Sequence, residues 1–201
     1  MFERNALTQL KEWAARSNHK PLVLRGARQV GKTTLVEQFA QEYEVYLKLN
    51  LEKSTDRQLF ESGMPMEELI STIYLLNNQE RKSVPTLLFI DEIQNSPQAV
   101  AMLRYFYEEV SGIDVVAAGS LLENLIDKHI SFPVGRVEYM AVRPCSFNEF
   151  LGAIDEKGLK AAQRDAALPA PLHDKMLRLF NTYTLIGGMP EVCLLYTSDA
   201  A

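Results

Sequence analysis

The sequence lacks three features, and each absence narrows the class of protein that it can encode. No apolar run approaches the roughly 18 residues that a membrane-spanning helix requires, so we expect no membrane partner. Basic residues are not in excess, because 21 lysines and arginines stand against 26 aspartates and glutamates, a net charge of −5. That balance does not support a dedicated nucleic-acid surface. The two cysteines, Cys145 and Cys193, have neither the spacing of a zinc site nor that of a disulfide framework.

The beginning of the chain also lacks a basic segment followed by an apolar run, so we expect no signal peptide and a cytoplasmic protein. What is present is the composition of a globular domain, with 47% hydrophobic and 23% charged residues. The 201 residues are enough for one α/β domain with a sizeable core, or for one domain and a fragment of another.

Short apolar runs alternate with helical patterns along most of the chain. We predict strands at residues 22–24, 45–50, 86–90, 113–118 and 135–142. Helical spacing of apolar residues predicts helices at 5–17, 32–43, 55–79 with an interruption at 63–65, 97–110, 146–152 and 171–184. Residues 161–170 are predicted to be a surface connection. Strands that are apolar on both faces are typical of a parallel sheet covered by helices on both sides, so we predict an α/β fold.

The most specific motif is a Walker A sequence between a predicted strand and a predicted helix. It consists of Gly26, Ala27, Arg28, Gln29, Val30, Gly31, Lys32 and Thr33, followed by Thr34. Its glycines let backbone N–H groups turn inward, its lysine reaches the β- and γ-phosphates, and its hydroxyl holds magnesium at a helix N-terminus. The motif therefore predicts that ATP and Mg²⁺ bind here, with Thr33 as a metal ligand and Lys32 assisting catalysis.

Two acidic residues end the third predicted strand, where α/β sheets bind their ligands. Asp91 follows an apolar run and is predicted to complete the magnesium site, as a Walker B carboxylate does. Glu92 is predicted to polarise a water molecule for attack on the γ-phosphate. A small-molecule kinase would instead need a pocket that excludes water, so Glu92 favours hydrolysis over phosphoryl transfer to a metabolite.

Two further polar residues follow or precede predicted strands and leave alternatives open. Ser120 follows the fourth strand and is either a sensor of the γ-phosphate or an N-cap of the next helix. Arg136 lies at the start of the fifth strand, where an arginine either reaches phosphate on its own or a neighbouring subunit or is solvated.

Together these motifs resemble a prokaryotic family of AAA-type ATPases related to the archaeal and STAND-like ATPases. Its members join an N-terminal ATPase core to a C-terminal domain of unknown function. The resemblance runs from about residue 5 to residue 192 and rests on the segments 24–34, 88–94, 117–123, 132–138, 146–150 and 187–192.

The resemblance implies more than the spacing of residues does. It implies a P-loop NTPase three-layer α/β/α sandwich with a mainly parallel five-stranded sheet, followed by the start of a helical lid. A strand inserted between the Walker A and Walker B strands would make the fourth strand central and favour Ser120 as a sensor. Arg136 becomes a candidate arginine finger, and Pro190, in a glycine-x-proline motif, is expected near the adenine end of the nucleotide.

The resemblance also divides the chain. Residues 1–145 are interpreted as the ATPase core and residues 146–192 as an incomplete helical lid or the start of a C-terminal region. Residues 193–201 resemble the translation of a transposon-derived sequencing adapter, and we interpret them as a non-native tail that includes Cys193. The C-terminal domain would then be missing, and turnover by this chain is expected to be impaired.

Two functions remain open at this point. The first is Mg²⁺-dependent ATP hydrolysis by an AAA-type core that acts through the missing domain. The alternative is a nucleotide-dependent binding switch, associated with DNA and with little hydrolysis of its own. In either case we expect a protein or DNA partner to bind through the missing domain, and an oligomer is compatible with the motifs.

Overall fold

Five parallel strands form the centre of the computed structural model, which describes residues 4–120, 133–162 and 168–199. The strands are β1 (Leu22–Arg25), β2 (Val45–Asn50), β3 (Thr86–Asp91), β4 (Ile113–Gly119) and β5 (Glu138–Ala141). Their order in the sheet is β2-β3-β4-β1-β5, and every neighbouring pair is parallel. This confirms the expected α/β fold, with β4 between the Walker A strand β1 and the Walker B strand β3.

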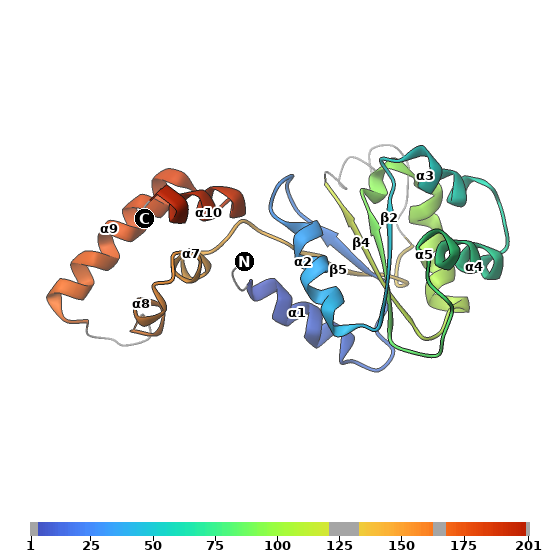
Figure 1. Ribbon diagram of the computed structural model, residues 1–201, viewed down its shortest axis with the longest axis horizontal. Coiled ribbons are helices and arrows are strands. Elements are labelled where there is room, and N and C mark those ends of the chain that lie inside the picture. The colour runs from blue at the N-terminus through green and yellow to red at the C-terminus, as the bar shows by residue number, and fades with distance from the viewer. Residues whose placement is uncertain (1–3, 121–132, 163–167, 200–201) are drawn as a thin grey trace.

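Helices cover both faces of the sheet, as Figure 1 shows. One face packs against α1 (Asn5–Ala14) and α2 (Lys32–Phe39). The other packs against α3 (Ser54–Glu61), α4 (Met66–Leu76) and α5 (Pro97–Glu109). Two short 3₁₀ helices, η1 (Ala40–Glu42) and η2 (Ile93–Asn95), follow α2 and β3.

The sheet is buried on both sides, which explains why its central strands are mostly apolar. Along β3, Leu87 and Phe89 pack on the α1/α2 side, whereas Leu88 and Ile90 pack on the α3/α4/α5 side. All six residues of β3 are buried. Alternate side chains of one strand thus enter two different cores.

The remaining helices lie beside the sheet and are joined to it by the segment that follows β5 (Figure 1). They are α7 (Phe147–Ala153), α8 (Lys157–Ala162), α9 (Ala170–Ile186) and α10 (Pro190–Asp199), called here the carboxy-terminal helices. Aromatic rings hold α7 to α9, because the ring of Phe147 lies 5.2 Å from that of Phe180 and 5.6 Å from that of Tyr183. These helices therefore have a small core of their own.

The structure corrects several sequence-based boundaries, and two of them have a clear local cause. β5 begins at Glu138 rather than at residue 135, because Gly135 has a φ of 74° and the N–H of Arg136 closes a turn on Pro133. Residues 161–162 were expected in a surface connection, but they end α8, whose Leu159 is buried. The segment after Ser120, where an N-capped helix was one alternative, lies outside the described residues.

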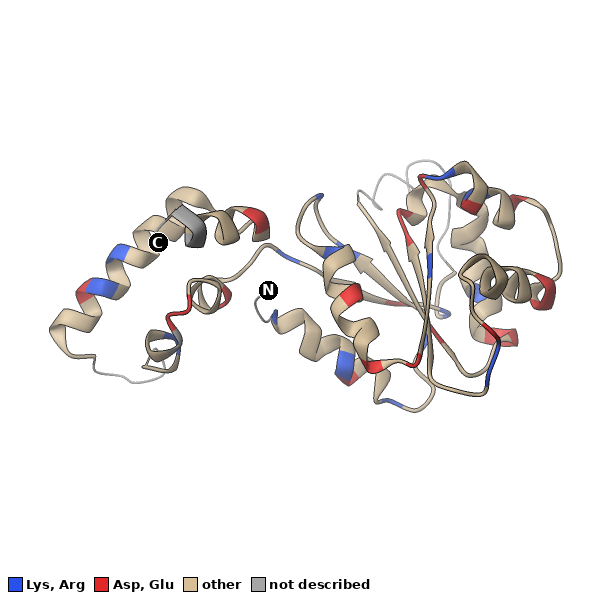
Figure 2. Ribbon diagram, viewed as in Figure 1, with Lys and Arg blue, Asp and Glu red and all other residues tan. Residues whose placement is uncertain are grey.

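Charge is distributed without a dominant sign. Figure 2 shows acidic and basic residues interspersed over both the sheet domain and the carboxy-terminal helices. In the part of the chain that the structure describes, no helix is both long and apolar enough to cross a membrane.

Two leucines on neighbouring helices test this core. Leu103 on α5 is fully buried, whereas Leu75 on α4 is 74% exposed. We expect Leu103→Ala to lower the free energy of unfolding by about 2–5 kcal/mol, because it leaves a cavity between α5 and the sheet. Leu75→Ala is the matched control and should change it by about 0.5 kcal/mol or less. Urea unfolding measures both, and equal losses would contradict the assigned burial.

Candidate functional site

The Walker A loop joins β1 to α2 at the edge of the sheet where all five strands have their carboxyl ends. Its backbone passes very close to the exit of β5: a Cβ atom on Gly26 would lie 2.2 Å from the carbonyl oxygen of Val142. The side chain of Val30 is buried in the core, which anchors the middle of the loop. Gly31, with a φ of 85°, is the residue from which α2 begins.

Lys32 lies across the loop that precedes it. Its Nζ donates hydrogen bonds to the carbonyl oxygens of Gly26 and Ala27, at 3.0 and 2.8 Å. Burial lowers the pKa of this ammonium, against the opposing charges of Glu92 and Asp91. A phosphate group at this position would offer the same ammonium a charged acceptor in place of two neutral carbonyls, which makes stronger hydrogen bonds.

Thr33 and Asp91 bring two oxygen ligands together, one from α2 and one from β3. The hydroxyl of Thr33 donates to Oδ2 of Asp91 at 2.9 Å. Burial raises the pKa of Asp91, although the hydrogen bonds from Thr33 and from the N–H of Glu92 oppose that effect. A hydroxyl and a carboxylate side by side at a phosphate loop are the donor types that Mg²⁺ prefers. These two residues therefore fit the predicted metal site.

Glu92 immediately follows the Walker B strand and turns the chain sharply. Its backbone has a φ of 53°, in the left-handed region, and its side chain lines the cavity beside the Walker A loop. The side-chain amide of Gln94 donates a hydrogen bond to the Glu92 carboxylate. The amide oxygen of Gln94 is buried and has no hydrogen-bond partner among the described residues. Gln94 therefore orients Glu92 and was not identified from the sequence.

A cavity of about 810 Å³ opens over the Walker A loop, within the size range of small-molecule sites. Ser120, at the end of β4 and only 3% exposed, lies on its wall. Pro190 also lines the cavity, with its Cγ 3.5 Å from the position of a Cβ on Gly31. The residues lining the cavity are Arg4, Arg28, Gln29, Gly31, Lys32, Thr33, Thr34, Leu35, Gln38, Glu92, Ser120, Pro190, Glu191, Leu194 and Leu195.

Arg136 lies elsewhere. In the sheet register, Glu138 is opposite Leu22, the first residue of β1, whereas the Walker A loop follows Arg25, the last. Because β1 has four residues, the two edges are about 13 Å apart. Arg136 pairs instead with Glu108 at 2.6 Å, on the edge remote from the cavity. In this structure Arg136 therefore does not lie at the cavity of its own chain.

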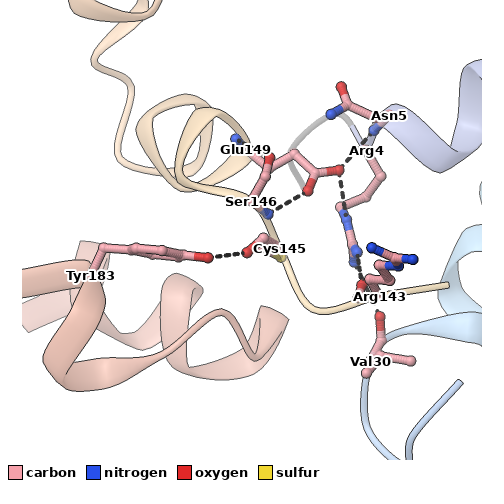
Figure 3. A network of polar contacts seen from close by, with 8 residues as sticks. All are labelled: Arg4, Asn5, Val30, Arg143, Cys145, Ser146, Glu149 and Tyr183. Carbon is pink, nitrogen blue, oxygen red and sulfur yellow. Dashed lines mark hydrogen bonds and ion pairs between the residues drawn. The ribbon is translucent and has the colours of Figure 1, made fainter. Parts of the chain in front are cut away.

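Sequence reasoning missed Arg4, which lines the cavity and is buried although it precedes the first helix. Its Nη1 donates to the carbonyl oxygen of Val30 at 3.1 Å, and its Nε pairs with Glu149 at 3.1 Å (Figure 3). No local pattern marks Arg4. A signal did exist for Glu149, because Ser146 three residues before it completes the capping box that begins α7.

Comparisons with known proteins give the family and the fold of the chain. A family model described as an AAA domain matches residues 18–151, more than half of the chain. Among solved structures, a Walker-type ATPase of Pyrococcus abyssi is similar with a TM-score of 0.57 and 17% identity, over 100% of this chain and 69% of that one. PCH-2 of C. elegans has a TM-score of 0.42 and 16% identity, over 83% of this chain and 47% of its own. No curated protein matches the sequence.

The close approach at Gly26 gives a direct test of the loop. Gly26→Ala places a methyl group against the backbone of Val142, so we expect a loss of about 1–3 kcal/mol in the free energy of unfolding and weaker nucleotide binding. Gly158→Ala is the control, because no atom lies within 4 Å of its added Cβ. Urea unfolding and nucleotide titration measure the two effects. A Gly26→Ala protein that behaves like Gly158→Ala would contradict the loop geometry.

Proposed function

This chain belongs to the AAA domain family, and on that premise we propose that it binds ATP with Mg²⁺ and hydrolyses it. One observation carries the proposal: the Thr33–Asp91 hydrogen bond lies next to Glu92, beside the phosphate loop. A metal-binding pair, a candidate base and a phosphate-binding lysine thus share one site.

Binding is the first step. The N–H groups at the start of α2 and the ammonium of Lys32 would hold the phosphates, and Thr33 and Asp91 would hold Mg²⁺. When bound, Mg²⁺ neutralises charge on the phosphate oxygens. Residues 146–192 would act as a lid, with Pro190 against the nucleotide. The cavity that this segment shares with the Walker A loop supports that role.

Hydrolysis is the second step. Glu92 would accept a proton from a water molecule whose oxygen bonds to the γ-phosphorus. The bond from that phosphorus to the oxygen of the β-phosphate breaks, which gives ADP and inorganic phosphate. Gln94 would hold the Glu92 carboxylate in place, and the hydroxyl of Ser120 would contact the γ-phosphate from the central strand.

A neighbouring copy of the chain is the remaining place for Arg136 to act. The exposed guanidinium, paired with Glu108, faces away from its own cavity. In an oligomer it would meet the γ-phosphate of the adjacent subunit, as an arginine finger does in trans.

Glu92→Gln tests the assignment of the base. The amide keeps the shape of the side chain but cannot accept the proton, so we expect phosphate release to fall about 10²–10⁴-fold while ATP binding is retained. Phosphate release and nucleotide titration are measured on the same preparation. Glu68→Gln, on an exposed position of α4, is the control and should leave the rate unchanged. Undiminished hydrolysis in Glu92→Gln, with ATP binding intact, would defeat the assignment of Glu92 as the base.

Lys32→Ala tests the phosphate site. Removal of the ammonium deletes a charged hydrogen-bond donor, so we expect the dissociation constant for ATP to rise roughly 10–100-fold. Equilibrium titration with a fluorescent ATP analogue measures it. The control is Lys53→Ala, at an exposed position before α3, which should bind as the unmodified chain does. Equal affinities of the two variants would defeat the placement of phosphate at the Walker A loop.

A further inference from the structure

Arg4 contacts two segments that are far from it in the sequence, the Walker A loop and residues 143–149. Its Nε donates to Glu149 in α7, its Nη1 to the carbonyl of Val30 in the Walker A loop, and its Nη2 to the carbonyl of Arg143, at 3.1, 3.1 and 2.7 Å. Figure 3 shows the guanidinium between these partners. A planar guanidinium has the geometry to hold several acceptors at once.

The opposite charges of Arg4 and Glu149 are both buried and form an ion pair. Arg4 is 7% and Glu149 5% exposed. One carboxylate oxygen of Glu149 accepts from Arg4 and from the N–H of Asn5, and the other accepts from the N–H of Ser146 at 2.7 Å. Burial would raise the pKa of Glu149, but these N–H groups and the guanidinium lower it overall, which keeps the carboxylate charged. Removal of either charge leaves the other buried and unpaired.

The connection fixes the geometry of the phosphate loop. The carbonyl of Val30 belongs to the peptide group that also carries the N–H of Gly31, and a planar peptide moves as one unit. By holding that carbonyl, Arg4 fixes the direction of a backbone N–H in the Walker A loop. A shift of this peptide on phosphate binding therefore changes the hydrogen bond from Arg4 to Val30 and, through the Arg4–Glu149 pair, the position of α7.

A second path returns from the carboxy-terminal helices to the same loop. The N–H of Cys145, beside the capping box of α7, donates to the carbonyl of Gly188 at 2.6 Å. The hydroxyl of Tyr183 in α9 donates to the carbonyl of Cys145 at 2.7 Å. Gly188 leads to Pro190, which lies against Gly31. These hydrogen bonds, the chain from Gly188 to Pro190 and the contact of Pro190 with Gly31 thus form a ring from the Walker A loop through Arg4 and α7 back to the cavity.

From this ring we propose that Arg4 and Glu149 are positioning residues that couple nucleotide binding at the Walker A loop to the placement of the carboxy-terminal helices. The proposal rests on the nucleotide binding proposed above. Neither residue carries out chemistry: Arg4 aligns the loop, and Glu149 holds Arg4 and the start of α7 in register. Without this ion pair, nucleotide binding at the Walker A loop no longer affects the placement of the carboxy-terminal helices.

Hydrogen exchange measured with and without a non-hydrolysable Mg²⁺–ATP analogue tests the coupling. In the unmodified chain, we expect the analogue to slow exchange in residues 26–34 and also, about tenfold, in α7, whose residues do not line the cavity. In Glu149→Gln, protection of residues 26–34 should remain while the slowing in α7 is lost. The dissociation constant of the analogue should be about tenfold higher for Glu149→Gln than for the unmodified chain.

Arg4→Lys is the second variant, because it keeps the charge but puts all its donors on one nitrogen in place of the planar fork of Nε, Nη1 and Nη2. It should give the same result as Glu149→Gln. Glu42→Gln breaks the exposed ion pair between Lys11 and Glu42 and is the control, which should match the unmodified chain. Two results would overturn this inference but not the proposed function. In the first, the analogue still slows exchange in α7 of a folded variant. In the second, the analogue protects residues 26–34 of the unmodified chain but does not slow exchange in its α7. An unmodified chain in which the analogue protects no residue would overturn the proposed function as well.

Discussion

The common direction of the five strands is the constraint on which the site depends. In a parallel sheet all carboxyl ends lie at one edge, so residues that follow different strands meet there. Thr33 comes from the helix after β1, Asp91 from the end of β3 and Ser120 from the end of β4. Their separation along the chain is therefore irrelevant to their separation in space. The same constraint places Arg136, which precedes β5, at the opposite edge.

The two halves of the molecule meet through polar contacts as well as apolar ones. The sheet and its covering helices bury large apolar side chains on both faces, whereas the carboxy-terminal helices have a small aromatic core of their own. Arg4, Glu149 and the carbonyls of Val30 and Arg143 lie where the two parts meet. A buried charged network is directional, so it specifies one arrangement of the two parts more sharply than apolar contact does.

Much of the fold was predictable because its signals are local. β2 was predicted at its observed residues, and the apolar run before Asp91 identified β3, since strands buried on both faces lose polar alternation. The Walker A loop was predictable because its glycines and lysine are contiguous. Arg4 was not, because its role depends on Glu149, 145 residues away. The start of β5 was misplaced because a turn at Gly135 competes with the strand pattern.

The left-handed backbone at Glu92 has a consequence for how this sequence balances stability against activity. A residue with a side chain in that conformation costs about 1–3 kcal/mol, whereas glycine adopts it freely. A sequence optimised for folding alone would carry glycine at this position. The chain instead has a carboxylate there, on the residue proposed above to accept a proton beside Asp91. The residue that is best for folding and the residue that the proposed hydrolysis needs are therefore different at this position.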